Sequence, residues 1–258
     1  MTAPTFDLSG RTALITGASS GLGARMARVL AASGAKVVLA ARRLDRLTGL
    51  AAEINAAGGG EAFPVVMDVT DEASIIAGFD AGEAALGPIN TVFANAGMNN
   101  RALAVEITDA AWDEVMAINV RGVFLTAREG ARRMMAAGSK EKGNGRIILV
   151  SSIGAQKVLP GLTAYCTSKA AVLMMGKSLA REWANRGINV NTICPGYVET
   201  ELNSEWFGEE GGKKQVAGFP RRRLMVEEDL DAMTLYLASD ASRAITGSVF
   251  TLDDGQTL

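Results

Sequence analysis

Short β-type runs alternate with longer helical stretches along this chain, and that alternation limits the possible fold more than any other feature. Several of the expected strands are almost continuously apolar, as in parallel strands that are buried on both faces. They cover Thr12–Thr16, Lys36–Ala40, Ala62–Val66, Thr91–Ala94, Gly145–Ser151, Asn189–Ile193 and Ser248–Leu252. The expected helices cover Leu22–Ser33, Leu44–Ala57, Glu72–Leu86, Asp109–Ala137, Ala164–Arg186 and Glu227–Ala238.

The sequence shows no internal repeat, low-complexity linker or break in composition, which predicts a single domain over residues 1–258. The strand–helix alternation favours an α/β fold with a Rossmann-type, doubly wound, parallel seven-stranded sheet flanked by helices. The polar segment Ser139–Asn144 is expected to be a loop. Glycines follow several expected helix ends, where a left-handed C-cap is favoured, at Gly34, Gly58, Gly87 and Gly187.

A glycine-rich stretch with aromatic residues interrupts the alternation late in the chain. Residues Leu202–Phe219 contain Trp206, Phe207 and four glycines. Long connections of this composition often close over a ligand, so we interpret the region of about residues 200–220 as a substrate flap. An ordinary surface loop is the alternative interpretation.

The 258 residues include no histidine, and this absence excludes several classes of enzyme. Ser-His-Asp hydrolysis, Cys-His chemistry and HExxH metal sites all need that side chain. With Cys166 and Cys194 as the only cysteines, a tetrahedral zinc site is not expected either, and we predict no metal site. Any proton transfer must therefore use tyrosine, lysine, aspartate or glutamate.

The bulk composition predicts a cytoplasmic protein that acts on a small molecule. The 26 basic and 28 acidic residues nearly balance, which gives no electrostatic reason to expect nucleic acid or an anionic membrane as partner. No apolar run reaches the ~18 residues that span a bilayer, and the first residues do not have the pattern of a signal peptide. Two cysteines without CxxC spacing favour reduced thiols.

The turn after the first expected strand is rich in glycine and leads directly into an alanine-rich helix. Such a turn lets backbone N–H groups approach a pyrophosphate, and the positive end of the helix dipole faces the same charge. The position between strand and helix is the one that a dinucleotide site requires. The residues predicted to bind the cofactor here are Gly17, Ser19, Ser20, Gly21, Leu22 and Gly23.

The spacing T-G-x-x-x-G-x-G, which starts at Thr16, resembles the short-chain dehydrogenase/reductase family in its compact single-domain branch. Two later stretches are similar to family motifs, namely Asp68-Val69 and Asn95-Ala96-Gly97. The resemblance implies that Asp68 accepts a hydrogen bond from the adenine amino group of the cofactor and that Val69 flanks the ring. A cap on the following helix is the alternative role for Asp68, although Asp71 suits that role better. It also implies that Asn95 braces the sheet, and that Gly97, after Ala96, lets the cofactor lie close.

A third stretch, Pro195-Gly196-Tyr197-Val198-Glu199-Thr200, resembles the family motif P-G-x-x-x-T. The resemblance implies that Val198 and Thr200 hold the carboxamide of the nicotinamide ring, while Pro195 and Gly196 bring the backbone near it. Together with the end of the chain, these motifs extend the resemblance over essentially all 258 residues.

The end of the second expected strand bears on the choice of nicotinamide cofactor. A site that prefers NAD usually has an acidic residue there, which binds the ribose hydroxyls. In this chain Ala41 occupies that position and is followed by Arg42 and Arg43. A guanidinium favours a 2′-phosphate by charge and by geometry, so we predict that NADP(H) is preferred over NAD(H). The alternative is that both arginines merely begin a solvated helix.

Four residues match the catalytic tetrad of the same family in type, order and spacing. Tyr165 and Lys169 are four residues apart, so both project from one face of a helix. Ser152 precedes the tyrosine by 13 residues, and Asn119 lies further upstream. A Tyr-x-x-x-Lys pair alone is weak evidence, but its occurrence with the serine, the asparagine and the phosphate loop is highly specific.

The predicted reaction is hydride transfer between the nicotinamide cofactor and a ketone or secondary alcohol. A free tyrosine has a pKa near ~10, and we expect the cation of Lys169 to favour the phenolate and bring that pKa closer to neutral. Tyr165 would then act as general acid/base on the substrate oxygen, which Ser152 would orient. The resemblance adds that Asn119 supports a helix irregularity and a water that leads protons from Lys169 to solvent.

Substrate identity stays open at this point. Val158, Leu159 and Leu162 could line an apolar pocket or belong to the core. One alternative activity is reduction of a 3-oxoacyl thioester on acyl-carrier protein or coenzyme A, with Arg132 and Arg181 facing an acidic carrier. A catalytically silent NADP-binding protein is a remote alternative, because such a relative would be expected to lack the tyrosine or the lysine.

The resemblance also implies a homo-oligomer, a dimer or tetramer built through long helices such as Ala164–Arg186. Its alanine- and methionine-rich faces suit such an interface but equally suit packing on the sheet. The residues concerned are Ala170, Ala171, Met174 and Met175.

Overall fold

The computed structural model describes residues 6–199 and 204–258, the latter without the side chains of residues 204 and 205. One parallel sheet contains strands β1 (Thr12–Thr16), β2 (Lys36–Ala41), β3 (Glu61–Val66), β4 (Thr91–Ala94), β5 (Gly145–Val150), β6 (Ile188–Pro195) and β7 (Val249–Leu252). The α-helices are α1 (Gly21–Ala32), α2 (Leu44–Ala57), α3 (Glu72–Leu86), α4 (Asp109–Met116), α5 (Val123–Ala136), α6 (Ser139–Lys142), α7 (Thr163–Trp183), α8 (Ser204–Gly208), α9 (Glu210–Ala217) and α10 (Asp231–Ala238).

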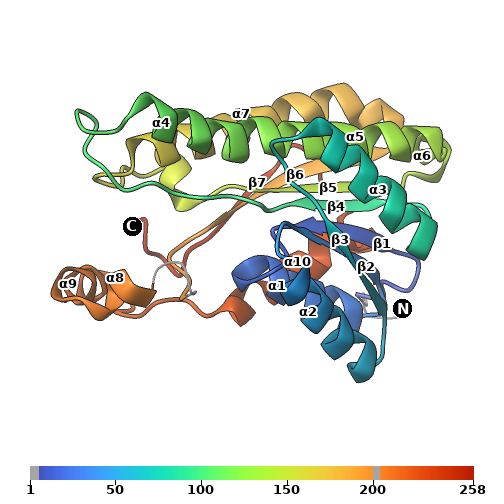
Figure 1. The fold of residues 1–258 in the computed structure, drawn as a ribbon, viewed down its shortest axis with the longest axis horizontal. Coiled ribbons are helices and arrows are strands. Elements are labelled where there is room, and N and C mark those ends of the chain that lie inside the picture. The colour runs from blue at the N-terminus through green and yellow to red at the C-terminus, as the bar shows by residue number, and fades with distance from the viewer. Residues whose placement is uncertain (1–5, 200–203) are drawn as a thin grey trace.

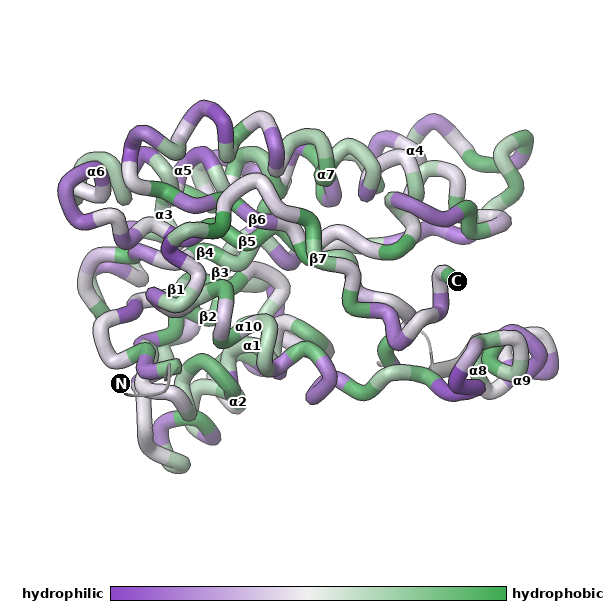
Figure 2. The backbone as a smooth tube through the Cα atoms, turned by 180° about the vertical axis from the view of Figure 1, so that it is seen from behind, coloured by the Kyte–Doolittle hydropathy of each residue, from purple (hydrophilic) through white to green (hydrophobic). Residues whose placement is uncertain are grey.

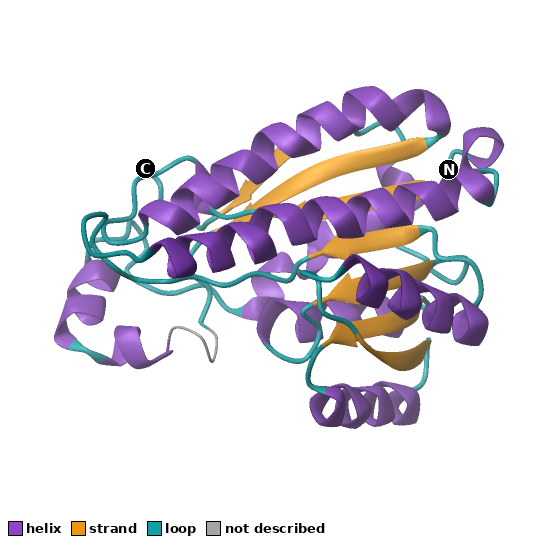
Figure 3. Ribbon diagram, turned by 45° about the horizontal axis from the view of Figure 1, so that its top comes forward, coloured by secondary structure: helices purple, strands orange, loops and turns teal. Residues whose placement is uncertain are grey.

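The strands lie in the order β3-β2-β1-β4-β5-β6-β7, and all of them run parallel. The order reverses between β1 and β4, which makes their carboxyl ends the switch point where open α/β sheets bind ligands. The predicted Rossmann-type, seven-stranded, single-domain fold is thus confirmed. Figure 3 shows the strands side by side, with helices in front and behind.

Two apolar layers hold the helices on the sheet. On one face, α1, α2 and α10 bury Leu30, Leu47 and Leu237 against the strands. On the other face, α3, α5 and α7 bury side chains such as Phe79 and Val172. The two groups of helices lie below and above the sheet in Figure 1. Hydrophobic residues accordingly follow the strands, whereas α6 at the surface is hydrophilic (Figure 2).

Several predicted boundaries differ in informative ways. The expected loop at Ser139–Asn144 contains one helical turn, α6, enclosed by Gly138 and Gly143 with φ of 81° and 63°. Residues Ala117–Gly122 interrupt the expected helix Asp109–Ala137 with a π-helical turn. The expected helices at Ala164–Arg186 and Glu227–Ala238 contain the 3₁₀ turns Ala184–Arg186 and Glu227–Leu230 at one end.

The glycines after the helices adopt positive φ, as the predicted caps require. Gly187 has the expected left-handed conformation, with φ 71° and ψ 26°. Gly58 and Gly87 differ, because their ψ is −179°. There the chain leaves the helix through an extended glycine rather than a left-handed cap, and Gly34 has a φ of 95°.

Candidate active site

The glycine-rich turn between β1 and α1 forms a tight cradle at the switch point. Gly17 and Gly21 have φ of 69° and 52°, a region that favours glycine. A Cβ on Gly23 would lie 2.4 Å from the carbonyl oxygen of Gly17, so no larger residue fits. The Ser20 side chain does not cap α1, which leaves first-turn amides available to a phosphate. The cradle therefore fits a dinucleotide.

Asn95 ties the end of β4 to the end of β1. Its Nδ2 donates to the carbonyl oxygen of Thr16 over 2.9 Å. The backbone N–H groups of Asn95 and Ala96 also donate to the same residue, each to Thr16 Oγ1 over 3.0 Å. The predicted brace of the sheet is therefore present, and it fixes the floor beneath Gly17.

Arg43 lies against the phosphate loop. Its Nη2 donates to Ser19 Oγ over 2.8 Å and to Ser20 Oγ over 3.0 Å. Arg42 is exposed and lies close enough to Asp68 to contribute to the lowering of its pKa. The structure thus places two cations around the predicted ribose site, at the end of β2.

Asp68 and Val69 follow β3 at the same edge of the sheet. Asp68 Oδ1 accepts from the backbone N–H and the hydroxyl of Thr70, and the first of these bonds is the main cause of its lowered pKa. Val69 is buried against Gly122. The cap of α3 is Asp71, which accepts from the N–H of Ala73, so Asp68 has no capping role.

Ser152 and Tyr165 meet where β5 ends and α7 begins. The Ser152 hydroxyl accepts from the backbone N–H of Gly154 over 3.0 Å, which holds the serine side chain in place. A hydrogen bond links Ser152 to the phenol of Tyr165. The predicted serine–tyrosine pair is therefore assembled from two separate elements.

Lys169 lies one helical turn beyond Tyr165 and is buried. Its Nζ donates to the carbonyl oxygen of Val150 over 3.0 Å and lies 5.6 Å from the centroid of the Tyr165 ring. A Cβ on Gly97 would lie 3.2 Å from that Nζ and 3.4 Å from Asn119 Oδ1. A side chain at position 97 would therefore crowd the ammonium.

Asn119 is fully buried in the π-helical turn and ties three segments together. Its Oδ1 accepts from the N–H of Met98, and its Nδ2 donates to the carbonyl oxygen of the same residue, each over 2.8 Å. The same Nδ2 donates to Ser168 Oγ over 3.0 Å. The helix irregularity expected at Asn119 is present, and it brings the amide beside α7.

The acidity of the tyrosine differs from expectation. Burial raises the pKa of Tyr165 to about 12, and the hydrogen bond with Ser152 opposes this rise. Burial also lowers the pKa of Lys169 to about 8. We expected the lysine cation to lower the tyrosine pKa, but in this structure burial is the larger effect and Ser152 is the neighbour that lowers it.

The segment after β6 closes the site on another side. Pro195 is buried, and Gly196 approaches the C-terminal segment so closely that a Cβ would lie 2.5 Å from Gln256 Oε1. Val198 is buried and pairs with Met225. The predicted Thr200 lies outside the described residues.

Tyr197 is a site residue that sequence reasoning missed, although it directly follows Gly196. Its ring packs edge-to-face on Phe207, with centroids 5.4 Å apart, and stacks on Phe219 at 5.6 Å. The aromatic residues of the expected flap therefore cover Tyr197. Trp206 lies on the same segment, which contains α8 and α9 and projects from the sheet at its carboxyl edge (Figures 1 and 3).

Arg101 is the second residue that the sequence did not single out. Its Cζ lies 4.4 Å from the centroid of the Trp206 ring. Of the apolar residues expected near the tyrosine, Leu159 and Leu162 are buried, whereas Val158 is 84% exposed. Leu159 and Leu162 therefore serve as packing residues beneath the loop.

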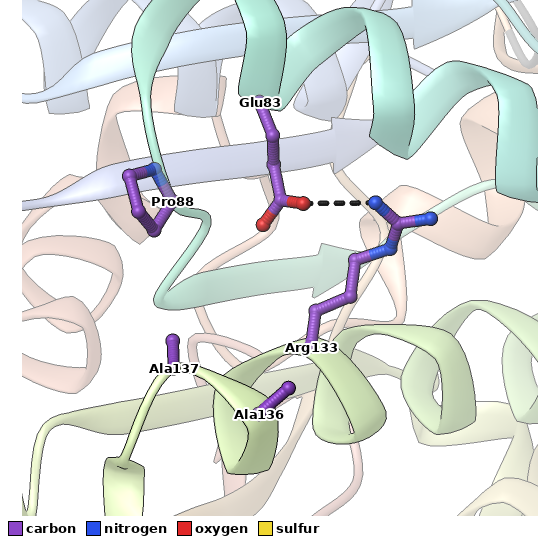
Figure 4. A pocket seen from close by; sticks show the side chains of 5 residues that line it. All are labelled: Glu83, Pro88, Arg133, Ala136 and Ala137. Atoms are coloured by element: carbon purple, nitrogen blue, oxygen red, sulfur yellow. Dashed lines mark hydrogen bonds and ion pairs between the residues drawn. The ribbon is translucent and has the colours of Figure 1, made fainter.

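A surface hollow between the ends of α3 and α5 is a poor candidate for the active site. Figure 4 shows its lining residues Glu83, Pro88, Arg133, Ala136 and Ala137. Arg133 is already paired with Glu83 at 2.8 Å. The hollow also lies where α3 and α5 end, at the edge of the sheet opposite to Tyr165. Within residues 6–199 and 204–258 no cluster of three metal-ligating side chains occurs, and no helix is long and apolar enough to span a membrane.

Comparison with known proteins places this geometry in a family. The family model for short chain dehydrogenases matches residues 11–211. Gluconate 5-dehydrogenase of Gluconobacter oxydans is 34% identical over 98% of this chain and 97% of its own. D-threitol dehydrogenase of Mycolicibacterium smegmatis is 36% identical over 98% and 95%. A gluconate 5-dehydrogenase from Burkholderia cenocepacia, solved with NADP and tartrate, has a TM-score of 0.90 at 33% identity, over 98% and 97%.

The chain belongs to the short-chain dehydrogenase/reductase family. It is a nicotinamide-dependent oxidoreductase that transfers a hydride between NAD(P) and a CH–OH group or the corresponding ketone.

Proposed function

We propose that this protein is an NADP(H)-preferring dehydrogenase that oxidises a secondary alcohol of a small polyhydroxylated molecule, with Tyr165 as general acid/base. The observation that best supports this proposal is that Ser152, Tyr165 and Lys169 lie together beside the glycine cradle. Asn119 is joined to the same helix by its hydrogen bond to Ser168.

The chain's own residues would handle the proton and the alignment. NADP(H) supplies or accepts the hydride when it is bound. Ser152 orients the substrate oxygen, and Tyr165 gives a proton to that oxygen during reduction or takes it during oxidation. Lys169 holds its ammonium near Gly97, where it can bind ribose hydroxyls. Asn119 keeps the π-helical turn in place and stands where a water could connect Lys169 to solvent.

The preference for NADP(H) rests on Arg42 and Arg43. Arg43 already donates to Ser19 and Ser20, so a 2′-phosphate placed there would meet a guanidinium and two hydroxyls. The relative from Burkholderia cenocepacia, solved with NADP, supports the choice. A carboxylate at position 41 would oppose it, and this chain has Ala41.

The polyhydroxylated substrate is inferred from relatives named for gluconate and D-threitol. The acyl-thioester alternative depends on Arg132 and Arg181, which lie toward the far ends of α5 and α7. Arg181 is 16 residues from Tyr165 on a helix, roughly 24 Å along its axis. That placement favours a small substrate.

The remaining features of the proposal concern assembly, location and the flap. We infer a homo-oligomer, because Ala170 and Met174 on α7 are exposed while Met175 packs on the sheet. Free thiols at Cys166 and Cys194 support a cytoplasmic location. The segment of α8 and α9 acts as the substrate flap that covers Tyr197.

The test follows NADPH and NADH absorbance separately with a panel of polyols, polyhydroxy acids, ketones and 3-oxoacyl thioesters. Tyr165→Phe should lower kcat by about 10²- to 10⁴-fold, as expected for loss of a general acid/base. NADPH binding by that variant, measured by fluorescence, should match the wild type. Turnover that survives in Tyr165→Phe would contradict the assignment of the proton donor.

A further inference from the structure

Within the part of the chain that the structure describes, no carboxylate pairs with Arg101, which stands beside the candidate active site. We propose that it determines substrate specificity by binding a carboxylate that the substrate carries in addition to the reacting alcohol. The inference rests on the proposed function and narrows its substrate class to hydroxy acids and the matching keto acids.

The position of Arg101 places it next to the start of the catalytic helix. The following residue, Ala102, donates its backbone N–H to the carbonyl oxygen of Gly161 over 2.9 Å and pairs with Leu162. A Cβ on Gly161 would lie 3.6 Å from Arg101 Cγ. Helix α7 begins at Thr163, two residues after Gly161, so Arg101 adjoins the turn that leads to Tyr165.

Contacts with the flap hold the guanidinium in place. Arg101 Cζ lies 4.4 Å from the centroid of the Trp206 ring. The indole Nε1 in turn donates to Gln215 Oε1 over 3.0 Å, and the Gln215 amide also hydrogen-bonds the Tyr197 phenol. A guanidinium that lies over an aromatic ring keeps its N–H donors at its edge, where they remain available to a planar acceptor.

Arg101 is exposed and differs in its partners from arginines that are held by carboxylates. Arg133, for example, has three carboxylate partners, which are Asp80, Glu83 and Glu129. Among the described residues, no carboxylate lies within ion-pair distance of Arg101, and its cation–π contact is the interaction that the structure shows. A fixed fork of donors without an acceptor is suited to bidentate binding of a carboxylate.

The charge of Arg101 acts on Tyr197, which neighbours the reacting phenol. Burial raises the pKa of Tyr197, and the Arg101 cation partly opposes that rise. Tyr197 itself lies close enough to Tyr165 to affect the pKa of that phenol. In the proposed binding mode, the substrate alcohol meets Tyr165 and Ser152, Tyr197 lies along the substrate, and its carboxylate meets Arg101.

The reaction stays the one already proposed, because the carboxylate takes no part in bond making. The alcohol loses its hydride to NADP⁺ and its proton to Tyr165, and a ketone forms. The carboxylate remains ionised and bound to Arg101. A neutral polyol of equal length would leave the guanidinium without an acceptor.

The experiment compares gluconate with glucitol, which has CH₂OH in place of the carboxylate. NADPH formation is followed for the wild type, Arg101→Gln and Arg101→Lys. We expect the wild type to have the higher kcat/KM with gluconate. In Arg101→Gln the ratio of kcat/KM for gluconate to that for glucitol should fall by about 10- to 100-fold, as for loss of a charge-assisted hydrogen bond. Arg101→Lys keeps the charge without the fork and should lie between.

The matched control is Arg243→Gln, which removes an exposed arginine beyond the 3₁₀ turn Asp240–Ser242 and should keep the wild-type ratio. An equal loss for both substrates in Arg101→Gln would show that Arg101 merely supports Trp206, and would overturn the proposal. Oxidation of glucitol without preference for gluconate would overturn it too, while leaving the proposed function intact.

Calorimetry keeps the proposal testable if neither compound is oxidised. Gluconate is titrated into the wild-type enzyme loaded with NADP⁺, and then into Arg101→Gln. A dissociation constant at least about tenfold weaker in the variant supports the carboxylate site. Equal affinity, or no binding to the wild type, overturns it. The proposed function is judged separately, by the loss of panel activity in Tyr165→Phe.

Discussion

At the scale of single residues, Ser152 connects local backbone structure to the chemistry. Its hydroxyl is held by the N–H of Gly154 and hydrogen-bonds the phenol of Tyr165. Burial acts on that phenol in the opposite direction and raises its pKa to about 12. Desolvation is therefore the main influence on the acidity of Tyr165, and the hydrogen bond with Ser152 opposes it.

This balance predicts the pH dependence of both directions. Oxidation needs the deprotonated Tyr165, so its kcat/KM should rise as the pH increases toward the phenol pKa, whereas reduction should fall there. Ser152→Ala removes a bond that lowers the pKa, so the oxidation limb should shift to higher pH. Ser152→Thr keeps the hydroxyl and serves as the control. A pH–rate profile of Ser152→Ala that only drops in height, without a shift, would contradict the assignment.

Also at the scale of single residues, the predicted preference for NADP(H) depends on Arg42 and Arg43. Arg43→Ala should raise the KM for NADPH by about 10- to 100-fold, because it removes a charge-assisted bond to the 2′-phosphate, which NADH lacks. Ala41→Asp should add repulsion of that phosphate and favour NADH. Steady-state KM values for both cofactors check this. Equal changes for NADPH and NADH would show that the arginines do not read the phosphate.

At the scale of elements, the turn from β1 to α1 depends on the absence of a side chain at Gly23. A Cβ there would lie 2.4 Å from the carbonyl oxygen of Gly17 and 2.7 Å from Asn95 Nδ2. The contact can be relieved only by moving the phosphate loop or the brace that joins β4 to β1.

Gly23→Ala should therefore destabilise the protein by about 1–3 kcal/mol and weaken NADPH binding. The matched control is Gly49→Ala within α2, where an added Cβ has no neighbour within 4 Å. That control should gain about 0.5–1 kcal/mol from helix propensity. Urea unfolding and NADPH titration measure both effects. Equal unfolding midpoints in the two variants would refute the steric argument.

At the scale of the whole molecule, the two faces of α7 differ in how far their side chains are buried. Ala171 and Met175 are half-buried, whereas Ala170 and Met174 are exposed, with Met174 at 63%. The alanine and methionine residues of this helix thus divide between sheet packing and a free stripe. The free stripe suits an interface with a second copy of the chain.

The predicted assembly should be visible in solution. Light scattering should return a multiple of the 26.9 kDa chain mass, and Met174→Glu should lower it because a charge on an apolar interface is unfavourable. Lys140→Glu, on the exposed turn α6 away from that stripe, controls for charge alone. A wild-type mass of one chain would exclude the oligomer.

Much of the fold and of the nucleotide site was predictable, because the signals are local. Buried parallel strands are continuous apolar runs, and β1 and β4 begin and end where those runs do. The tight turn at Gly17 and Gly21 requires positive φ, a conformation that glycine residues in a sequence indicate directly. The tetrad residues were found by their order and spacing. For the strands and the glycine turn a few neighbouring residues carry the whole signal, whereas the tetrad prediction combines residues from Asn119 to Lys169.

Helices α8 and α9 were harder to predict. Gly211 and Gly212 lower helix propensity, so the segment resembles a loop. The glycine at position 212 is what lets α9 pack closely against α8. A Cβ on Gly212 would lie 2.1 Å from the carbonyl oxygen of Trp206, which is too close. The expectation of a covering segment with aromatic residues agrees with the contacts of Phe207 and Phe219 on Tyr197.

Only the tertiary structure brings distant residues together, and their sequence separation explains why. Asn119 meets Ser168, 49 residues away, and Arg43 meets Ser19 across 24 residues. Arg101 meets Trp206 between segments that no local pattern connects. Local periodicity determines which elements form, because it reports burial of one face. Packing of those elements decides which side chains meet, and also how far burial shifts the pKa of Tyr165, since desolvation depends on everything that surrounds the phenol.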